Sequence, residues 1–598
     1  MRSAVHPSAA LWKNSDVSFY TLMTTLKVYT NEDDALLFWS IPQRIPGCRG
    51  FAIERKRKRV NQPDEQKFLD NRVGFENEKA PAEAKEGQPA VLKPSTEWPF
   101  QRFSWTDHDA DTGDTVSYRV VPVLRDAAGK LVLDQADASA FSDERTLGNA
   151  PDARFAPYFN RGFVISQFMS RFLAENGLDF NSKTDMTKFK EELGKSETPI
   201  RHFLSGDLRV ALLDLLESAR KDGREVFGAL FELSDDELIE ALAKLGNKAH
   251  IVLANGSITA AKGEGSEAAR KRDENKDSRA ALEQAGVDVI AIDRFISPGA
   301  LGHNKFLVVT GDGGEPAIAW TGSTNWAPTG LCTQVNNGLL IRDAKVAKIY
   351  REQWQRLRDA KSGFEGLAKA NSDPKPVDDD VTVWFTRTAG GVDLDALQAE
   401  VKNAKQGILF LMFMPGSAGL FSTVAARSDD PGLYVRGVAT ELPNGQADPS
   451  VADVNLIDGA NHTPLHFDMI QAEGLDHPMA NFVAEVTHKQ FTANIGHAII
   501  HSKVVVIDPF SDSPVVISGS HNFSTTASQK NDENFIIIKG DRDLAEAYAV
   551  NVMGAFAHYR WRAFIGKTKK PFNGLQDNDT WQEPKMAAEA SELRFWGV

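Results

Sequence analysis

Cysteine is almost absent from this sequence, since only Cys48 and Cys332 occur among 598 residues. Two distant cysteines cannot build the disulfide framework that holds many small secreted domains together. They also cannot supply the four ligands of a structural zinc site. The sequence therefore predicts a protein that folds around a hydrophobic core, and we expect no metal ion and no other cofactor.

Long apolar runs and an excess of positive charge are also missing. No apolar stretch approaches the roughly 20 residues that span a bilayer, and residues 1–30 lack the layout of a signal peptide. The net charge is −14, which disfavours a broad basic surface for nucleic acid but allows a local basic cleft. We expect a cytoplasmic protein, or one exported without a conventional signal peptide, with no transmembrane segment.

What the sequence does contain is one pattern of polar residues that occurs twice. The second copy reads His501-Ser502-Lys503, Asp508, Gly519-Ser520-His521-Asn522 and Asn531-Asp532-Glu533-Asn534. The first copy reads His303-Asn304-Lys305, Gly322-Ser323-Thr324-Asn325 and Asn336-Asn337. The first histidines of the two copies are 198 positions apart (501 − 303). This repeat predicts one active site built from two halves of a single chain, and hence a monomer.

Strand and helix patterns divide the chain into a β-rich part and a duplicated part. Short apolar segments separated by turns predict a β-sandwich over residues 26–150. Strands then alternate with helices in two similar runs, 155–370 and 381–567, which predicts two similar α/β lobes. An N-terminal segment, 1–25, and a polar C-terminal tail, 568–598, flank these domains, and we expect the tail to lie across the surface.

Apolar runs and periodicity place the elements of the two lobes. Strands are predicted in the first lobe at 225–233, 249–253, 287–292, 305–309 and 317–321. Strands are predicted in the second lobe at 381–386, 407–414, 434–439, 482–487, 503–507, 515–518 and 535–538. Amphipathic spacing predicts helices at about 344–358 and 543–564.

The repeated residues suit chemistry on a phosphate group. Residues two apart on a strand project to the same face, so each His-x-Lys pair places an imidazole and an ammonium over one ligand. Glycine and serine at the strand end let backbone and hydroxyl groups approach an anion, and the asparagines donate amide hydrogens. The phosphate would be surrounded by Lys305, Ser323, Asn325, Lys503, Ser520 and Asn522.

The two histidines suggest a reaction with two steps. One imidazole can attack phosphorus and form a covalent intermediate. The other can protonate the leaving oxygen and then activate water. Because lysines and asparagines supply the charge stabilisation, this chemistry needs no metal.

These residues resemble the paired HxKxxxxD motifs of the phospholipase D superfamily. The second motif matches in full, whereas the first has Thr310 at the aspartate position, with Asp312 two residues later. The resemblance covers roughly residues 155–567 and implies two α/β lobes with the site at their interface. It also implies that His303 is the nucleophile and His501 the acid and base. In the N-terminal part, residues 105–107 and 118–120 are similar to fibronectin type III domains over two or three strands.

Two carboxylates are predicted to support the site. Asp508 lies five residues beyond Lys503, so we expect it to face away and to anchor the end of its strand. Glu533 is expected to back His501 and raise its basicity. Its counterpart in the first half is Asn336, so this alignment leaves His303 without a carboxylate. On this physical ground His501 is the better nucleophile, while the family precedent favours His303; we keep the precedent, and both assignments stay open.

Three functions fit this pattern. The first is a phospholipase D that hydrolyses phospholipids to phosphatidic acid through a phosphohistidine intermediate, with peripheral membrane contact. The second is a nuclease that cleaves DNA or RNA with the same two-histidine site. The third is a binding protein whose β-domain recruits a partner while the repeat is vestigial. We favour the lipid substrate; a cleft lined by basic and stacking aromatic side chains would favour nucleic acid.

Overall fold

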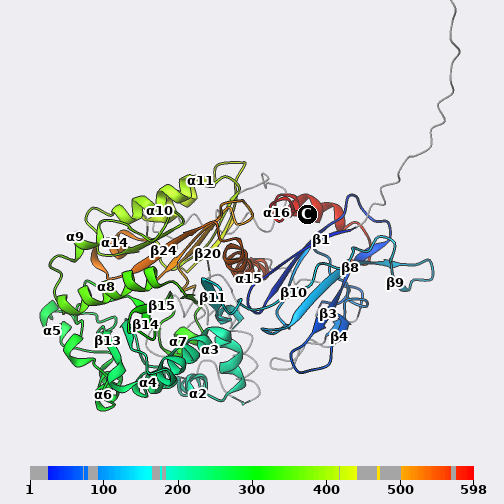
Figure 1. Ribbon diagram of the computed structural model, residues 1–598. Coiled ribbons are helices and arrows are strands. Elements are labelled where there is room, and N and C mark those ends of the chain that lie inside the picture. The colour runs from blue at the N-terminus through cyan, green and yellow to red at the C-terminus, as the bar shows by residue number, and fades with distance from the viewer. Residues whose placement is uncertain are drawn as a thin grey trace, which may run out of the picture.

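The computed structural model describes residues 24–71, 73–78, 92–164, 176–177, 183–416, 418–440, 468–471, 500–567 and 574–598. In these residues a β-rich domain stands beside two α/β lobes (Figure 1). The strand predicted at 482–487 and nearly all of the N-terminal segment 1–25 lie outside the described residues.

The β-rich domain consists mainly of two antiparallel sheets. One sheet has the order β1 (Thr25–Thr30), β2 (Ala35–Ser40), β7 (Ser104–Asp107). The other has the order β10 (Arg145–Thr146), β8 (Thr115–Arg125), β3 (Cys48–Lys58), β4 (Glu65–Phe68), with β9 (Leu131–Leu133) on β8. Buried rings of Trp39 and Phe103 both pack against Phe51, which lies between them in the core.

The two lobes contain sheets with the same strand order. The first sheet runs β11 (Phe155–Phe159), β16 (Asn337–Ile341), β15 (Pro316–Gly322), β14 (Lys305–Thr310), β12 (Val226–Leu230), β13 (Ala249–Leu253). The second runs β17 (Lys375–Pro376), β18 (Val381–Phe385), β24 (Asn534–Lys539), β23 (Val515–Gly519), β22 (Val504–Ile507), β19 (Gly407–Met412), β20 (Tyr434–Ala439), β21 (Asp468–Gln471). From β11 and from β18 onward, four antiparallel pairings are followed by parallel pairing, which joins two strands in the first sheet (β12 and β13) and three in the second (β19, β20 and β21). The predicted pair of similar α/β lobes is therefore confirmed.

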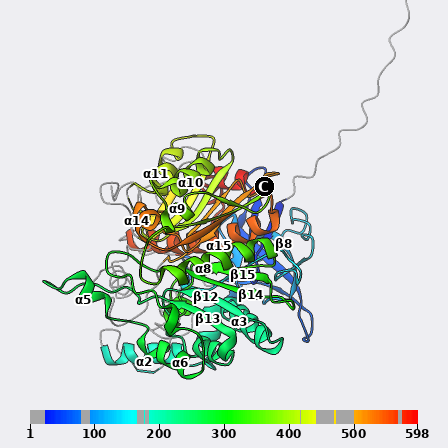
Figure 2. The same ribbon diagram turned by 60° about the vertical axis from the view of Figure 1, so that its left-hand side comes forward.

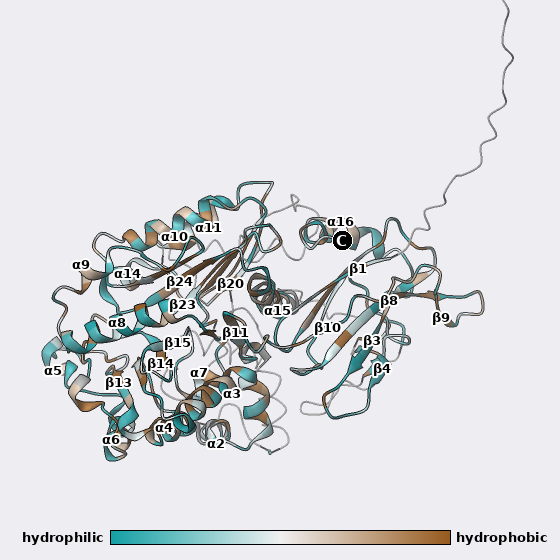
Figure 3. Ribbon diagram, in the orientation of Figure 1, coloured by the Kyte–Doolittle hydropathy of each residue, from teal (hydrophilic) through white to brown (hydrophobic). Residues whose placement is uncertain are grey.

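Two long helices fill the space between these sheets (Figure 2). Helix α8 (Ala344–Ala360) packs on β14 and β15 of its own lobe and also reaches β18. Helix α15 (Arg542–Lys567) packs on β19 and β20 and also reaches β11. The sheet strands are apolar along their length because helices cover both faces (Figure 3). The two sheets and these helices share one core, which fixes the lobes against each other.

Two sequence predictions for this part of the fold were wrong. Residues 287–292 form a bridge at Asp288 and a short 3₁₀-helix, Ile290–Ile292, instead of a strand, and Ile290 is 48% exposed. The C-terminal tail contains helix α16 (Gln582–Phe595), which packs against β2 and β20. Its flanking Trp581 and Trp596 are buried, so their apolar area draws a mostly polar segment into the core.

The anchoring role predicted for Asp508 is confirmed. Its carboxylate accepts backbone N–H groups of Lys405, Gln406 and Gly407 at 2.6–3.1 Å, at the start of β19. In the first lobe the Thr310 hydroxyl accepts the backbone N–H of Glu225 at 2.9 Å. Threonine thus performs a smaller version of the same task, which explains how the first motif keeps its geometry without the aspartate.

Replacing Asp508 by alanine is predicted to lower the free energy of unfolding by about 2–4 kcal/mol, because three backbone donors lose their acceptor. Thr310→Ala, which affects one donor, should cost about 1 kcal/mol. Urea denaturation of both variants measures the difference. Equal losses would contradict the anchoring account.

Candidate active site at the lobe interface

The two predicted histidines meet where the lobes meet. His303 lies just before β14 and His501 just before β22, and their ring centroids are 6.3 Å apart. Their residues are 3% and 4% exposed, so both imidazoles lie below the surface. The structure therefore brings the two halves of the repeat into one site.

Each lysine lies beside the histidine of its own motif. The Lys305 ammonium donates to the carbonyl of His303 at 2.8 Å, and Lys503 donates to the carbonyl of His501. Both lysines are buried. Burial lowers the pKa of Lys503 and the charge of Lys305 lowers it further, so the two ammonium groups act on each other and together create a positive potential at the position expected for a phosphate.

Two phenylalanines complete the pairs: Phe231, which sequence reasoning missed, and Phe413, which it assigned to the buried sheet core. The Phe231 ring lies 4.8 Å from the His303 ring and 4.9 Å from the Lys305 ammonium. Phe413 takes the same place in the second lobe, 4.8 Å from both His501 and Lys503. Each follows the end of the strand that pairs with its motif strand. In the sequence, a Phe that follows a buried strand in both copies of the repeat was the signal that could have revealed these two residues.

The prediction that Glu533 backs His501 was wrong. Glu533 Oε1 lies 3.2 Å from Nδ1 of His303, the histidine of the other lobe. His501 Nδ1 instead faces Asn336 Oδ1 at 2.9 Å and the Ser323 carbonyl at 3.0 Å. Each histidine thus has its Nδ1 atom against a group from the other lobe, and it is His303 that faces the carboxylate.

The exchange follows from the way the segments before β16 and β24 cross the interface. The backbone N–H groups of His501 and Ser502 donate to the Val335 carbonyl at 2.9 and 2.8 Å. In the same way, the N–H of Asp532 donates to the Leu301 carbonyl at 2.8 Å. The segment before β16 therefore lies against the loop that carries His501, and the segment before β24 lies against the loop that carries His303.

The carboxylate of Glu533 is held from several sides. Asn531 Nδ2 donates to Oε1 at 2.9 Å, and the N–H of Asn522 donates to Oε2 at 2.9 Å. Next to it, Asp532 forms buried ion pairs with Arg294 of the first lobe and Arg387 of the second. This network fixes the carboxylate against both lobes at once.

One asparagine from each copy of the pattern, Asn337 and Asn534, links the sheets of the two lobes. Asn337 Nδ2 donates to Ser518 Oγ at 2.7 Å and to the Tyr548 hydroxyl at 3.1 Å. Asn534 Oδ1 accepts from Thr321 Oγ1 at 2.6 Å and from the Tyr350 hydroxyl at 3.0 Å. These are equivalent contacts in opposite directions, so the interface has approximate two-fold symmetry.

The predicted serines lie inside this framework. Ser323 donates to Asn336 Oδ1 at 2.7 Å, and Ser520 Oγ accepts the N–H of Asn534 at 3.1 Å. Neither residue is exposed. Ser323 thus holds Asn336 in place, and Ser520 holds Asn534. Contact of these hydroxyls with a phosphate stays a prediction.

The predicted asparagines each keep one carbonyl oxygen without a partner. The Oδ1 atoms of Asn325 and Asn522 are buried and make no hydrogen bond within the described residues. Asn325 Nδ2 donates to Glu232 Oε2 at 2.8 Å. Glu232 was missed by sequence reasoning because it has no counterpart in the second copy of the pattern.

Burial and mutual repulsion set the protonation of the site. Burial and the Lys305 charge lower the pKa of His303 to about 4, although Glu533 opposes this shift. Burial lowers the pKa of Lys305 to about 7. Burial and Lys503 hold the pKa of His501 well below its usual value. Burial alone would raise the pKa of Glu533, but His303, His521 and the Asn531 hydrogen bond together lower it to about 2. A site with these shifts favours an incoming anion.

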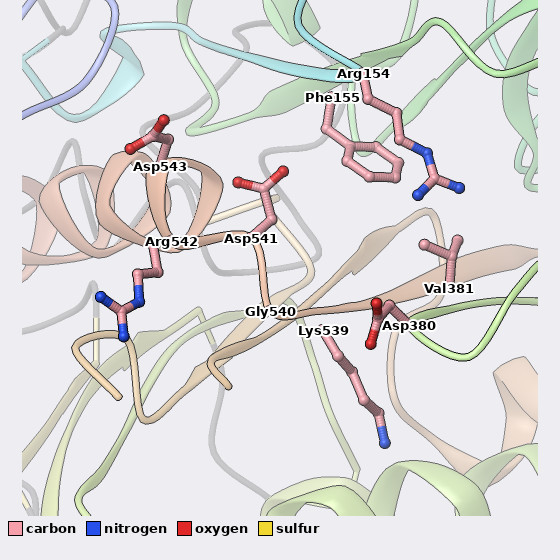
Figure 4. Close-up of a pocket in the computed structure, with 9 residues that line it drawn as sticks. All are labelled: Arg154, Phe155, Asp380, Val381, Lys539, Gly540, Asp541, Arg542 and Asp543. Atoms are coloured by element: carbon pink, nitrogen blue, oxygen red, sulfur yellow. The ribbon is translucent and has the colours of Figure 1, made fainter. Parts of the chain in front are cut away.

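A charged hollow of about 450 Å³ lies elsewhere on the surface, between the start of β11 and the loops around β18 and β24 (Figure 4). Its cations already have partners: Arg154 pairs with Asp343 and Asp378, Lys539 with Glu400, and Arg542 with Asp512. The histidines do not line it. Within the described ranges, no group of three or more His, Cys, Asp or Glu side chains could hold a metal ion.

Glu533→Gln is predicted to lower the pKa of His303 further below about 4, because the carboxylate charge that favours the imidazolium is removed. NMR titration of the histidine Cε1–H signals measures this shift. Asp512→Asn removes a fully exposed carboxylate and should leave both histidines unchanged. A shift of His501 with His303 constant would contradict the exchanged backing.

Comparison with known proteins agrees with the two-lobed site. A family model described as cardiolipin synthase, phospholipase D-like domain, matches residues 212–358 and 446–552, which include both His-x-Lys motifs. The phospholipase D of Rickettsia felis is 49% identical over 53 residues, which is 9% of this chain and 24% of that relative. The chain thus aligns with about a quarter of that relative's length.

Three solved structures show partial likeness. Phosphatidylserine synthase of Haemophilus influenzae is 11% identical with a TM-score of 0.36, over 62% of this chain and 91% of that one. Nuc of Salmonella typhimurium, a phospholipase D family member, is 19% identical with a TM-score of 0.20, over 31% and 96%. Polyphosphate kinase of Porphyromonas gingivalis is 12% identical with a TM-score of 0.34, over 87% and 75%.

No helix among the described residues is both long and apolar enough to cross a bilayer. The family model matches one segment in each half of the repeat, and each segment includes one of the two histidines that meet at the interface. The chain therefore carries a phospholipase D-like domain in two segments, one in each half of the repeat.

Proposed function

We propose that the protein is a metal-independent phosphodiesterase of phospholipase D type, in which His303 is the nucleophile and His501 the acid and base. The observation that carries this proposal is the unequal backing of the two rings. His303 faces the Glu533 carboxylate, whereas His501 faces only an amide oxygen and a carbonyl. A carboxylate makes an imidazole a better nucleophile, and a neutral acceptor leaves it a stronger acid.

In the first step, Nε2 of His303 attacks phosphorus. Its Nδ1 faces Glu533, so the lone pair is on Nε2, and the positive charge that develops on the ring is stabilised by the carboxylate. The bond between phosphorus and the leaving oxygen breaks, and His501 transfers its proton to that oxygen. The anionic substrate raises the pKa of His501 on binding, which keeps this imidazole protonated at that moment.

In the second step, water replaces His303 on phosphorus. Neutral His501 accepts a proton from the water, a new P–O bond forms and the P–N bond breaks. Lys305 and Lys503 stabilise the charge on the phosphoryl oxygens in both steps, and their burial strengthens this effect. The same set of residues in both halves argues against a vestigial repeat.

For the substrate, we propose a phospholipid that is hydrolysed to phosphatidic acid. Near the site, the side chain of Met414 is apolar and 38% exposed, beside the partly exposed Phe413. On the other side lie two acidic side chains, Glu232 and Glu274; burial and Glu274 raise the pKa of Glu232, while Lys305 opposes this shift. Neither side chain supplies a cation for the flanking phosphates of a nucleic acid. Cleavage of DNA or RNA by the same two histidines is the alternative. Both halves of the site lie in one chain, which supports a monomer.

Rapid kinetics with bis(p-nitrophenyl) phosphate should separate the two histidines. Because p-nitrophenolate leaves without protonation, His501→Ala is predicted to give a burst of one nitrophenol per site. Slow turnover should follow, reduced about 10²–10⁴-fold, because water lacks its base. His303→Ala should give no burst. A burst in His303→Ala but not in His501→Ala would reverse the assignment.

The substrate class is tested by hydrolysis of mixed phospholipid vesicles and of single- and double-stranded DNA and RNA, all in EDTA. Lipid turnover that is lost in both histidine variants is the expected result. Nucleic-acid cleavage lost in both variants would move the protein to the nuclease alternative. Activity that disappears only in EDTA would overturn the metal-independent mechanism.

A further inference from the structure

The two copies of the pattern differ at the third residue of their Gly-Ser-x-Asn segment. The second copy has His521 there, and the first copy has Thr324. Both residues contact an asparagine that links the sheets. The His521 N–H donates to the Asn534 carbonyl at 3.2 Å, and Thr324 Oγ1 donates to the Asn337 carbonyl at 3.1 Å. The copy that has this histidine is also the copy that places a carboxylate, Glu533, against His303.

The His521 ring is buried between two partners. Its Nε2 lies 3.1 Å from Oδ2 of Asp393, and neither residue is exposed. Its Nδ1 accepts the backbone N–H of Phe523 at 2.9 Å. An imidazole nitrogen that accepts a hydrogen bond carries no hydrogen, so the hydrogen of the neutral ring is on Nε2 and faces the carboxylate. His521 therefore uses both of its nitrogens at once.

Asp393 holds the ring from the far side. Its Oδ1 accepts from the hydroxyls of Thr388 and Ser528. Burial alone would raise the pKa of Asp393, but His521 and these hydroxyls together lower it. The carboxylate is therefore charged and fixed, and a fixed carboxylate sets both the tautomer and the orientation of the imidazole beside it.

The other nitrogen of His521 supports a tight turn beside the active site. Phe523 has a φ of 56°, in the left-handed region that residues with a Cβ seldom occupy. The hydrogen bond from Phe523 to His521 Nδ1 offsets part of this cost. Between these two residues lies Asn522, whose N–H donates to Glu533 Oε2 at 2.9 Å. The turn thus directs a backbone donor at the carboxylate that lies beside His303.

We infer that His521 is a positioning residue for the reaction, because it holds the Asn522 N–H against Glu533 and so keeps the carboxylate behind His303. The inference rests on the proposed phosphodiesterase function, and it adds a residue that does not touch the substrate. A displaced Glu533 would stabilise the positive charge on the His303 ring less well once the ring is bonded to phosphorus. Formation of the phosphohistidine would then slow. Its hydrolysis would not slow, since that step removes the charge.

Two substitutions separate the two contacts of the ring. His521→Asn keeps an acceptor near the position of Nδ1 for the Phe523 N–H but does not reach Asp393. His521→Gln reaches Asp393 with an amide N–H but has no acceptor near the position of Nδ1. We expect phosphohistidine formation to stay within about twofold in His521→Asn, because an asparagine can accept from the backbone two residues on. His521→Gln should slow it about tenfold.

Both steps are measured in one trace with bis(p-nitrophenyl) phosphate, in the His501→Ala background. The burst phase reports formation of the phosphohistidine, because p-nitrophenolate leaves without an acid, and the slow phase reports its hydrolysis. His521→Gln should slow the burst and leave the slow phase no slower. His202→Gln removes an exposed histidine from the first lobe and should change neither phase.

A second readout does not depend on turnover. In ¹⁵N-histidine NMR spectra at neutral pH, an imidazole N–H held against a carboxylate gives a far-downfield proton signal. The His303 signal is identified by its loss in Glu533→Gln. It should keep its position in His521→Asn and move upfield in His521→Gln.

Three results would overturn the inference. They are a burst and a slow phase lowered by the same factor in His521→Gln, equal losses in His521→Asn and His521→Gln, and a His303 signal that is lost in folded His521→Asn. The last result decides the matter even where His521→Gln does not fold, as circular dichroism shows. No release of nitrophenol by the wild type would instead refute the phosphodiesterase function, and the NMR signal would still test how Glu533 is held.

Discussion

Each histidine of the site is held by the half of the chain to which it does not belong. Glu533 of the second lobe lies against His303 of the first, and Asn336 of the first lies against His501 of the second. The site therefore cannot form within one lobe, however well that lobe folds. Two features hold the lobes in the position that this exchange requires. They are the shared core around α8 and α15 and the contacts of Asn337 and Asn534 across the interface.

The exchange also breaks the symmetry that the repeat creates. Two equal imidazoles beside two equal ammonium groups would have no reason to take different roles. One carboxylate, clamped through Asp532 to Arg294 and Arg387, makes the rings unequal. The residues that the two copies share supply the positive charge, and the residues that differ between them make the two histidines unequal.

Much of this arrangement could be predicted from the sequence because it depends on local patterns. Apolar runs located most of the described strands, and the spacing of Asp508 from Lys503 predicted that it faces away from the site. The partner of Glu533 could not be obtained in this way. Aligning the two copies shows which residues are equivalent, but a contact across a two-fold interface joins residues that are not equivalent. Phe231 was missed because it follows a buried strand and reaches the site only through the pairing of that strand with β14. The tail was misjudged because two tryptophans outweigh its polar composition.

The central claim is that Glu533 makes His303 the nucleophile. The most direct test is rapid chemical quench of the wild-type protein during turnover of a phosphodiester, followed by mass spectrometry of its peptides under conditions that preserve phosphohistidine. The account predicts that the phosphoryl group is found on His303 and that Glu533→Gln lowers its yield. A phosphoryl group on His501 would contradict the account, since the ring without the carboxylate would then be the one that attacks.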